Sequence, residues 1–206
     1  MTERVQRLCL LKGESKLFIA SGSTVSIFNC QNGTVEAQWP AANADHEDEK
    51  NSEDVKAEDA GSQQKNKKNK KGKGNKSNPM VGEILETADG NHLVASFSDK
   101  TIRLFSKKLE VLHTWVAHKR PSILVNSPSG TSFLAGDLFG DVHEYDWILR
   151  EDVKHLLGHL SMILGLCTAE RGSQHFVITS DRDEHIRISN YPDTYNINSF
   201  CLGHVE

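Results

Sequence analysis

Cysteine is scarce in this 206-residue chain, and its placement excludes several kinds of site. The four cysteines are Cys9, Cys30, Cys167 and Cys201, and no two of them form a CxxC pair. A cysteine-based zinc site and a redox dithiol are therefore not indicated. No apolar run approaches the roughly 20 residues of a membrane-spanning helix, and the charged N-terminus lacks the apolar core of a signal peptide. We expect an intracellular protein with reduced thiols and no membrane association.

Catalytic motifs are also missing. GxSxG, GxGxxG, GxxxxGK[ST] and HExxH do not occur in the sequence. His155 and His159 are four residues apart, but their segment has the pattern of a strand end and a turn, where helical spacing has no meaning. The acids Asp181, Asp183 and Glu184 indicate a tight turn rather than a cation site. We predict no catalytic, cofactor-binding or metal-binding residue, and a protein that is not an enzyme.

The sequence does contain a repeat. The segments that share it are 21–29, 98–106, 139–147 and 181–189. Each places a small or acidic turn before residues that alternate in polarity, which is typical of a strand with one buried face. Equivalent positions at Phe28, Phe105, Tyr145 and Ser189 are separated by 77, 40 and 44 residues. Leaving out the polar residues 42–79 shortens the first interval to about 39, close to the ~40–45 residues of a WD-type propeller repeat.

A second marker runs in phase with the first. It consists of Ala117-His118, Gly158-His159 and Gly203-His204, at intervals of 41 and 45 residues. These pairs resemble the glycine-histidine marker of WD repeats, in which the histidine joins a buried network with an aspartate of a turn. The resemblance implies structural roles for His118, His159 and His204, with Asp99 and Asp183 as the acids and Thr179 or Ser180 as a hydroxyl partner. The third repeat has Phe139 at the acid position, so its network is missing or uses Asp137 or Asp141.

Residues 42–79 break the repeat. Between Asp45 and Ala60 there are eight acidic residues and two lysines, and between Lys65 and Lys76 there are seven lysines and no acid. A segment with almost no apolar residue cannot offset its ordering entropy, so we predict disorder. The insert is either a solvated loop whose halves partly neutralise each other, or a nuclear import signal or RNA-backbone contact. An import signal and an RNA-backbone contact would both use Lys67, Lys68, Lys70, Lys71 and Lys73.

The segment from Leu157 to His204 carries a more specific resemblance. Its runs LGHLSMILGL, FVITSDRDEHIRISNYP and INSFCLGHVE resemble the WD-repeat non-catalytic subunits of the eukaryotic tRNA (guanine-N7)-methyltransferase. That resemblance implies a seven-bladed propeller that forms a heterodimer with a catalytic methyltransferase subunit. The catalytic partner would bind S-adenosylmethionine, so this chain would need no cofactor. The complex would hold tRNA, and the resemblance implies a location in the nucleus.

We therefore predict an all-β fold, a WD-repeat β-propeller with about four blades present of an expected seven. Residues 1–41 would form blade 1, 42–79 the insert, and 80–206 blades 2–4, with the chain stopping at the start of the next blade. The charged cluster around the turn of the fourth repeat suggests partner-binding roles for Arg182, Glu184 and Arg187. The alternatives are that Arg187 merely covers its blade, and that the protein is a general WD-repeat adaptor, for a ubiquitin ligase or a histone tail.

Overall fold

The computed structural model describes residues 4–40, 78–150 and 153–202, and sixteen strands account for most of them. The strands form four antiparallel sheets of four strands each, and the described residues include no helix. The predicted all-β, WD-repeat propeller class with four blades is confirmed. The seven-bladed ring stays a prediction. The insert at 42–79 lies almost wholly outside the described residues.

Each sheet is built from consecutive strands, and so each is one blade. Blade 1 consists of β1 (Val5–Leu10), β2 (Lys16–Ser21), β3 (Thr24–Asn29) and β4 (Thr34–Trp39). Blade 2 consists of β5 (Val81–Glu86), β6 (His92–Phe97), β7 (Thr101–Ser106) and β8 (Val111–Val116). Blade 3 consists of β9 (Pro121–Asn126), β10 (Ser132–Asp137), β11 (Asp141–Asp146) and β12 (Lys154–Gly158). Blade 4 consists of β13 (Ile163–Arg171), β14 (Gln174–Asp181), β15 (Ile186–Tyr191) and β16 (Ile197–Cys201).

Alternating side chains explain why these segments are strands. In β3, Val25 and Ile27 are buried, while Thr24 and Ser26, which alternate with them, are partly exposed. The hairpin turns that join the strands use glycine where the backbone turns left-handed, as at Gly33 with φ 71° and Gly90 with φ 68°. Glycine adopts this conformation without the steric cost that a Cβ atom brings.

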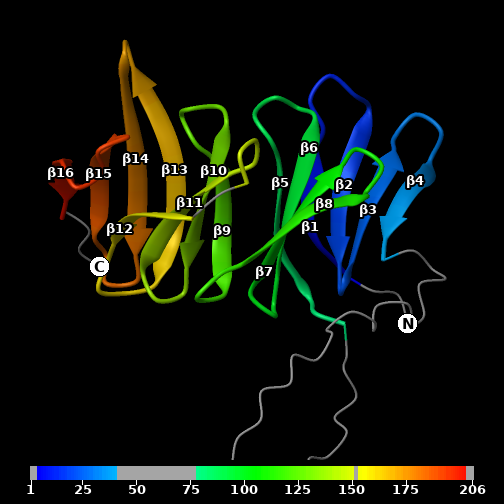
Figure 1. Cartoon of the computed structure of the whole chain (residues 1–206), viewed down its shortest axis with the longest axis horizontal. Helices are drawn as coiled ribbons and strands as arrows, with labels where there is room; N and C mark the ends of the chain where they lie inside the picture. The colour runs from blue at the N-terminus through cyan, green and yellow to red at the C-terminus, as the bar shows by residue number, and fades with distance from the viewer. Residues whose placement is uncertain (1–3, 41–77, 151–152, 203–206) are drawn as a thin grey trace, which may run out of the picture.

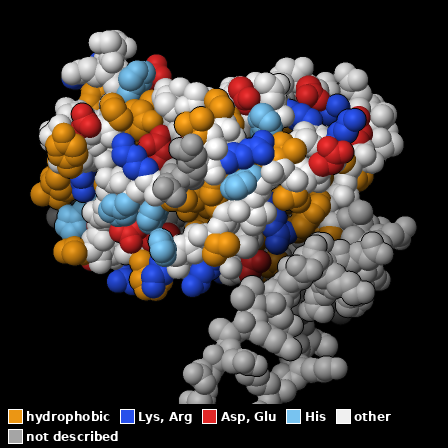
Figure 2. Space-filling view, viewed as in Figure 1, with side chains coloured by type: hydrophobic (Ala, Val, Ile, Leu, Met, Phe, Trp, Pro, Cys, Tyr) orange, Lys and Arg blue, Asp and Glu red, His pale blue; other side chains and the backbone are white. Residues whose placement is uncertain are grey.

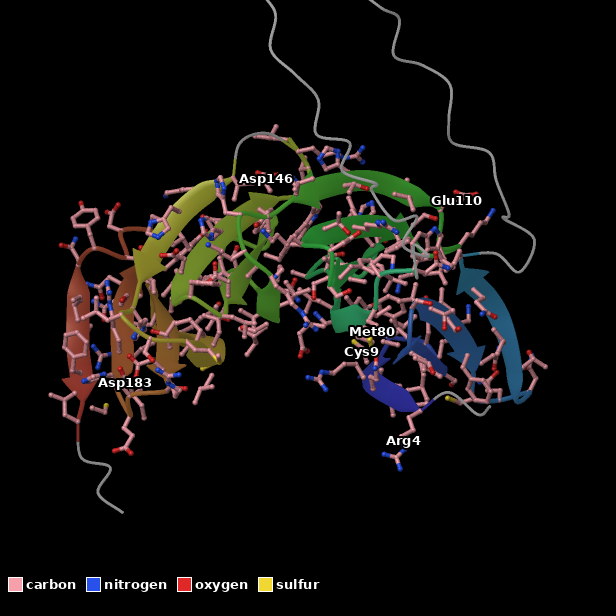
Figure 3. The ribbon with its side chains drawn as sticks, turned by 90° about the horizontal axis from the view of Figure 1, so that it is seen from below. Arg4, Cys9, Met80, Glu110, Asp146 and Asp183 are labelled. Atoms are coloured by element: carbon pink, nitrogen blue, oxygen red, sulfur yellow. The ribbon has the colours of Figure 1, made fainter. Side chains whose placement is uncertain are left out.

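The four blades stand in a row, with β1, β5, β9 and β13 as neighbouring inner strands (Figure 1). Seen along the strands, the row is an arc that has blade 1 at one end and blade 4 at the other (Figure 3). The hydrophobic core lies between successive blades, in three clusters that join blade 1 to 2, 2 to 3 and 3 to 4. A four-stranded blade cannot bury both of its faces alone, so stacking against the next blade supplies the buried area.

Polar contacts add to this packing at each junction. Between blades 1 and 2, the Arg103 guanidinium lies 4.5 Å from the ring centre of Trp39 and 4.6 Å from that of Phe97. Between blades 3 and 4, the Tyr191 hydroxyl donates to Oε1 of Glu144 at 2.6 Å. The junctions hold the blades in register, and this register positions the turns at the blade ends.

Candidate partner-binding surface

The turn between β14 and β15 carries three charged side chains in succession, and Asp181 holds its shape. One oxygen of Asp181, Oδ1, accepts hydrogen bonds from the backbone N–H of Asp183 at 3.0 Å and of His185 at 2.9 Å. Glu184 has a φ of 67°, in the left-handed region. The side chains of Arg182, Asp183 and Glu184 point outward and are exposed. Figure 3 shows Asp183 near the blade 4 end of the arc.

The second oxygen of Asp181 ties this turn to the start of the blade. His159 Nδ1 is 3.0 Å from Asp181 Oδ2, and its Nε2 is 2.7 Å from Oγ1 of Thr179. The His159 and Asp181 side chains are only 4% exposed, and Thr179 is fully buried. The order Thr–His–Asp is also that of a nucleophile, base and orienting acid. Because Thr179 is not accessible to a substrate, the arrangement has a structural role.

The assignment of Asp183 to the His159 network is wrong. Asp183 instead accepts a hydrogen bond from the Ser161 hydroxyl at 3.0 Å, and its side chain is 52% exposed. The two aspartates are two residues apart in a turn, and the one at the strand end is the one that points into the blade. Of the two hydroxyl candidates, Thr179 occupies the predicted place rather than Ser180.

Hydrogen bonds explain the acidity of Asp181. Burial alone would raise the pKa of this carboxyl. The backbone N–H of His185 and the rings of His159 and His185 stabilise the ionised form, and together they hold the pKa below its ordinary value. The carboxylate that organises the turn is therefore charged at neutral pH.

The equivalent network is absent from the described part of blade 3. Asp137 is at the position of Asp181 and accepts from the backbone N–H of Phe139 at 2.7 Å and of Asp141 at 3.2 Å. Ala135 stands where blade 4 has Thr179, so a histidine here has no hydroxyl partner. His118 is accordingly exposed and has no hydrogen bond to Asp137.

Blade 2 has no acid at this position, because Phe97 occupies it. Asp99 was predicted as a network acid, and this is wrong. Its Oδ1 accepts from the backbone N–H of Thr101 at 3.0 Å and from the Thr101 hydroxyl at 2.7 Å, which closes a local turn. His204 lies outside the described residues, and its predicted role stays a prediction.

Arg187 differs from its neighbours in the turn. Its guanidinium donates to the Ser189 hydroxyl at 2.8 Å, to the Thr194 carbonyl at 2.8 Å and to the Gly158 carbonyl at 3.4 Å. These contacts link β15 to the end of blade 3. Partner binding through Arg187 stays a prediction, but the group that would make it is already engaged within the chain.

Two exposed hydrophobic residues that the sequence reasoning missed flank the charged turn. Leu160 is fully exposed, and Phe139 is 62% exposed with the Lys119 ammonium 4.1 Å from its ring centre. Leu160 precedes Ser161, which binds Asp183, and Gly140 next to Phe139 accepts from the His159 N–H at 2.9 Å. Figure 2 shows hydrophobic and basic side chains along this lower edge of the arc. The signal in the sequence is a large apolar residue at a turn position, where polar residues are the rule.

Other predicted features have simpler outcomes. Lys67, Lys68, Lys70, Lys71 and Lys73 lie outside the described residues. Within the described ranges, no helix is long and apolar enough to cross a membrane. In the same ranges, no three histidine, cysteine or acidic side chains are placed to hold a metal ion together.

Comparison with known proteins gives one consistent family. The family model described as "tRNA methyltransferase TRM82 WD40 domain" matches residues 17–154 and 149–206. A relative from Aedes aegypti, named tRNA (guanine-N(7)-)-methyltransferase non-catalytic subunit wuho, is 34% identical over 136 residues, 59% of this chain and 33% of its own. The TRM82 subunit of Lodderomyces elongisporus is 34% identical over 136 residues, 62% of this chain and 35% of its own. The wuho subunit of Drosophila willistoni is 47% identical over 77 residues, 37% of this chain and 18% of its own.

The similarity to this family was first seen in the fourth repeat, and these matches extend it over most of the chain. The chain spans about a third of the length of the first two curated relatives. The two matched segments together cover well over half of the chain. The charged turn, the Asp181–His159 network and the four blades therefore belong to a protein of the TRM82 WD40-domain family.

Proposed function

We propose that this chain supplies propeller blades of a non-catalytic subunit that binds and stabilises a tRNA (guanine-N7)-methyltransferase. The names of its relatives, each a non-catalytic subunit of that enzyme, support this function. S-adenosylmethionine would bind to the catalytic subunit and not to this chain. The heterodimer would hold tRNA, and this chain would contribute binding and not chemistry. The proposed location is the nucleus.

The observation that carries the proposal is a rigid turn with unengaged charges beside exposed hydrophobic residues. The Arg182 side chain is 68% exposed and has only a distant contact of 3.7 Å with Asp183. Glu184 is exposed and makes no hydrogen bond through its side chain to any described residue. Exposed apolar residues with arginine nearby are the usual composition of a protein interface. We assign this surface, made of Phe139, Leu160, Arg182 and Glu184, to the catalytic subunit.

Co-expression with the methyltransferase subunit tests the proposal. A stable complex and increased guanine-N7 methylation of tRNA are expected. Arg182→Glu should weaken the complex by about 2–5 kcal/mol if the arginine pairs with a buried acid of the partner. Arg171→Glu is the matched control, because Arg171 is exposed on the same blade at the end of β13, away from the turn.

Two results would contradict the proposal. One is the absence of both a complex and added methylation, which would favour a general WD-repeat adaptor with another partner. The other is equal weakening of the complex by Arg182→Glu and Arg171→Glu. That result would show that the charged turn is not part of the interface, although the two proteins still bind each other.

The lysine-rich segment requires a separate experiment. Deleting residues 65–76 should move the protein to the cytoplasm if the lysines form an import signal. The same deletion should flatten the salt dependence of tRNA binding if they contact phosphates, because each lost phosphate contact reduces the number of counterions released. A deletion that changes neither property would identify the segment as a solvated loop.

A further inference from the structure

Two histidines face each other across the outer strands of blade 3. His143 in β11 and His155 in β12 are directly opposed in the antiparallel register. Their ring centres are 5.1 Å apart, with the ring planes at 74°. Directly opposed residues of an antiparallel pair have Cβ atoms about 4.5–5.5 Å apart, so their side chains can reach one small ligand. Figure 2 shows histidine side chains gathered over β12, beside acidic ones.

Asp141 adds an oriented carboxylate to this pair. It lies two residues before His143, and alternate residues of a strand share a face. Its Oδ1 is 3.1 Å from Nε2 of His155, which leaves Nδ1 of that ring available. A carboxylate that holds one ring nitrogen fixes the orientation of the ring and increases the basicity of the other nitrogen, as it does for metal-binding histidines.

His143 has both ring nitrogens available. It forms no hydrogen bond with any residue in the described ranges, although it is half-buried. A third ring, that of the exposed His118, has its centre 6.4 Å from that of His143. Three imidazoles are thus clustered where blade 3 has no buried histidine network.

We propose that His143 and His155 chelate a divalent transition-metal ion, with Asp141 holding the His155 ring. Imidazole is a good ligand for Ni²⁺, Cu²⁺ and Zn²⁺. The described residues do not place three ligands together, so the protein supplies two ligands and water supplies the others. Ligands twelve residues apart on two strands form no recognisable motif, so this site could not be predicted from the sequence. Asp141 follows Phe139 by two residues, and both backbone N–H groups donate to Asp137, so this site lies beside the proposed partner surface. Metal binding does not depend on the proposed function.

Titration of the untagged protein with Ni²⁺ in a calorimeter tests the site. His155→Ala and His143→Ala should each reduce the affinity at least about tenfold, and Asp141→Asn should reduce it by about tenfold, the scale of changes to groups that orient a ligand. His175→Ala is the control, because His175 lies in β14 and its nearest charged partner is Glu170, 3.5 Å away. The His175→Ala variant should bind Ni²⁺ with the same affinity as the unmodified protein.

A loss of Ni²⁺ binding is informative only in a variant that still folds. His155 is exposed, so His155→Ala should keep the circular dichroism spectrum and thermal unfolding of the unmodified protein. A folded His155→Ala variant that binds Ni²⁺ as tightly as the unmodified protein would overturn the proposal. An equal loss of affinity in His175→Ala would overturn it too, because the binding would then be spread over surface histidines.

Discussion

His159 and Asp181 are 22 residues apart in the chain, and their side chains meet at 3.0 Å inside blade 4. One oxygen of Asp181 orders the turn that follows β14, and the other anchors His159 at the entry to the blade. The turn that presents Arg182 and Glu184 is therefore fixed by a buried side chain, and not only by its own backbone.

Replacing Asp181 by Asn should destabilise the protein by about 1–3 kcal/mol, because buried hydrogen-bond donors lose their charged acceptor. Asp183→Asn should have almost no effect, because the Asp183 side chain is half exposed, accepts one hydrogen bond from Ser161 and is otherwise only 3.7 Å from the exposed Arg182. Urea denaturation measures both variants. Equal losses would show that the two acids share the role that we assign to Asp181.

The lowered pKa of Asp181 predicts a pH dependence with a definite sign. An acid whose folded pKa is below its unfolded value of about 3.9 contributes stability above that value. The contribution is lost as the pH falls below about 4 and through the folded pKa. The stability difference between the unmodified protein and Asp181→Asn should therefore shrink as the pH falls below about 4. A difference that stays constant down to pH 2 would contradict the pKa direction.

Gly140 predicts a steric effect. Its φ is 106°, and a Cβ atom would clash with the His159 carbonyl oxygen and lie 2.6 Å from that of Ser161. Gly140→Ala should destabilise the protein by about 1–3 kcal/mol more than the backbone conformation alone requires. Gly172→Ala is the control, because Gly172 has a φ of 63° with nothing within 4 Å of the added carbon. Thermal unfolding compares the variants, and equal losses would assign the effect to backbone strain.

Tyr145 predicts a loss of stability at high pH. Burial, with a smaller effect of the Asp137 charge, raises the pKa of Tyr145 to about 12. A tyrosine with a folded pKa above its unfolded value of about 10 stabilises the fold below pH 10. About 2–3 kcal/mol is lost as the pH rises from 10 to 12. Tyr145→Phe removes this dependence, so its stability relative to the unmodified protein should rise over that pH range. Denaturation at pH 8 and pH 11 measures the difference.

The strands could be predicted from the sequence because each has its own alternating pattern between turn residues. The strands Thr24–Asn29 and Thr101–Ser106 lie at the ends of the repeat segments 21–29 and 98–106, after the turn residues, as that pattern predicts. In the repeat segment 181–189 the strand β15 begins only at Ile186, because the backbone N–H of His185 donates to Asp181 and belongs to the turn. The strand β10 extends to Asp137, because Gly136 and Asp137 continue the pairing with β9.

The candidate site was harder to predict, because it depends on which side chains turn inward. Asp181 and Asp183 have the same side chain and belong to one turn. The pairing of β14 with β13 determines that Asp181 is the one whose side chain points at His159. Leu160 and Phe139 come from different connections, and the backbone contact of Gly140 with His159 brings those connections together. Likewise, a register shift between Val142 and His143 opposes His143 to His155, and no spacing rule reveals this.

The way each blade is built from consecutive strands has a consequence for synthesis. All hydrogen bonds within a blade join residues of one repeat, so loops are short and their closure costs little entropy. Each blade can therefore form soon after its own residues leave the ribosome, while later residues are still being added. The new blade then has one apolar face covered by its predecessor and one waiting for its successor. In this sense the order of the chain is also the order of assembly.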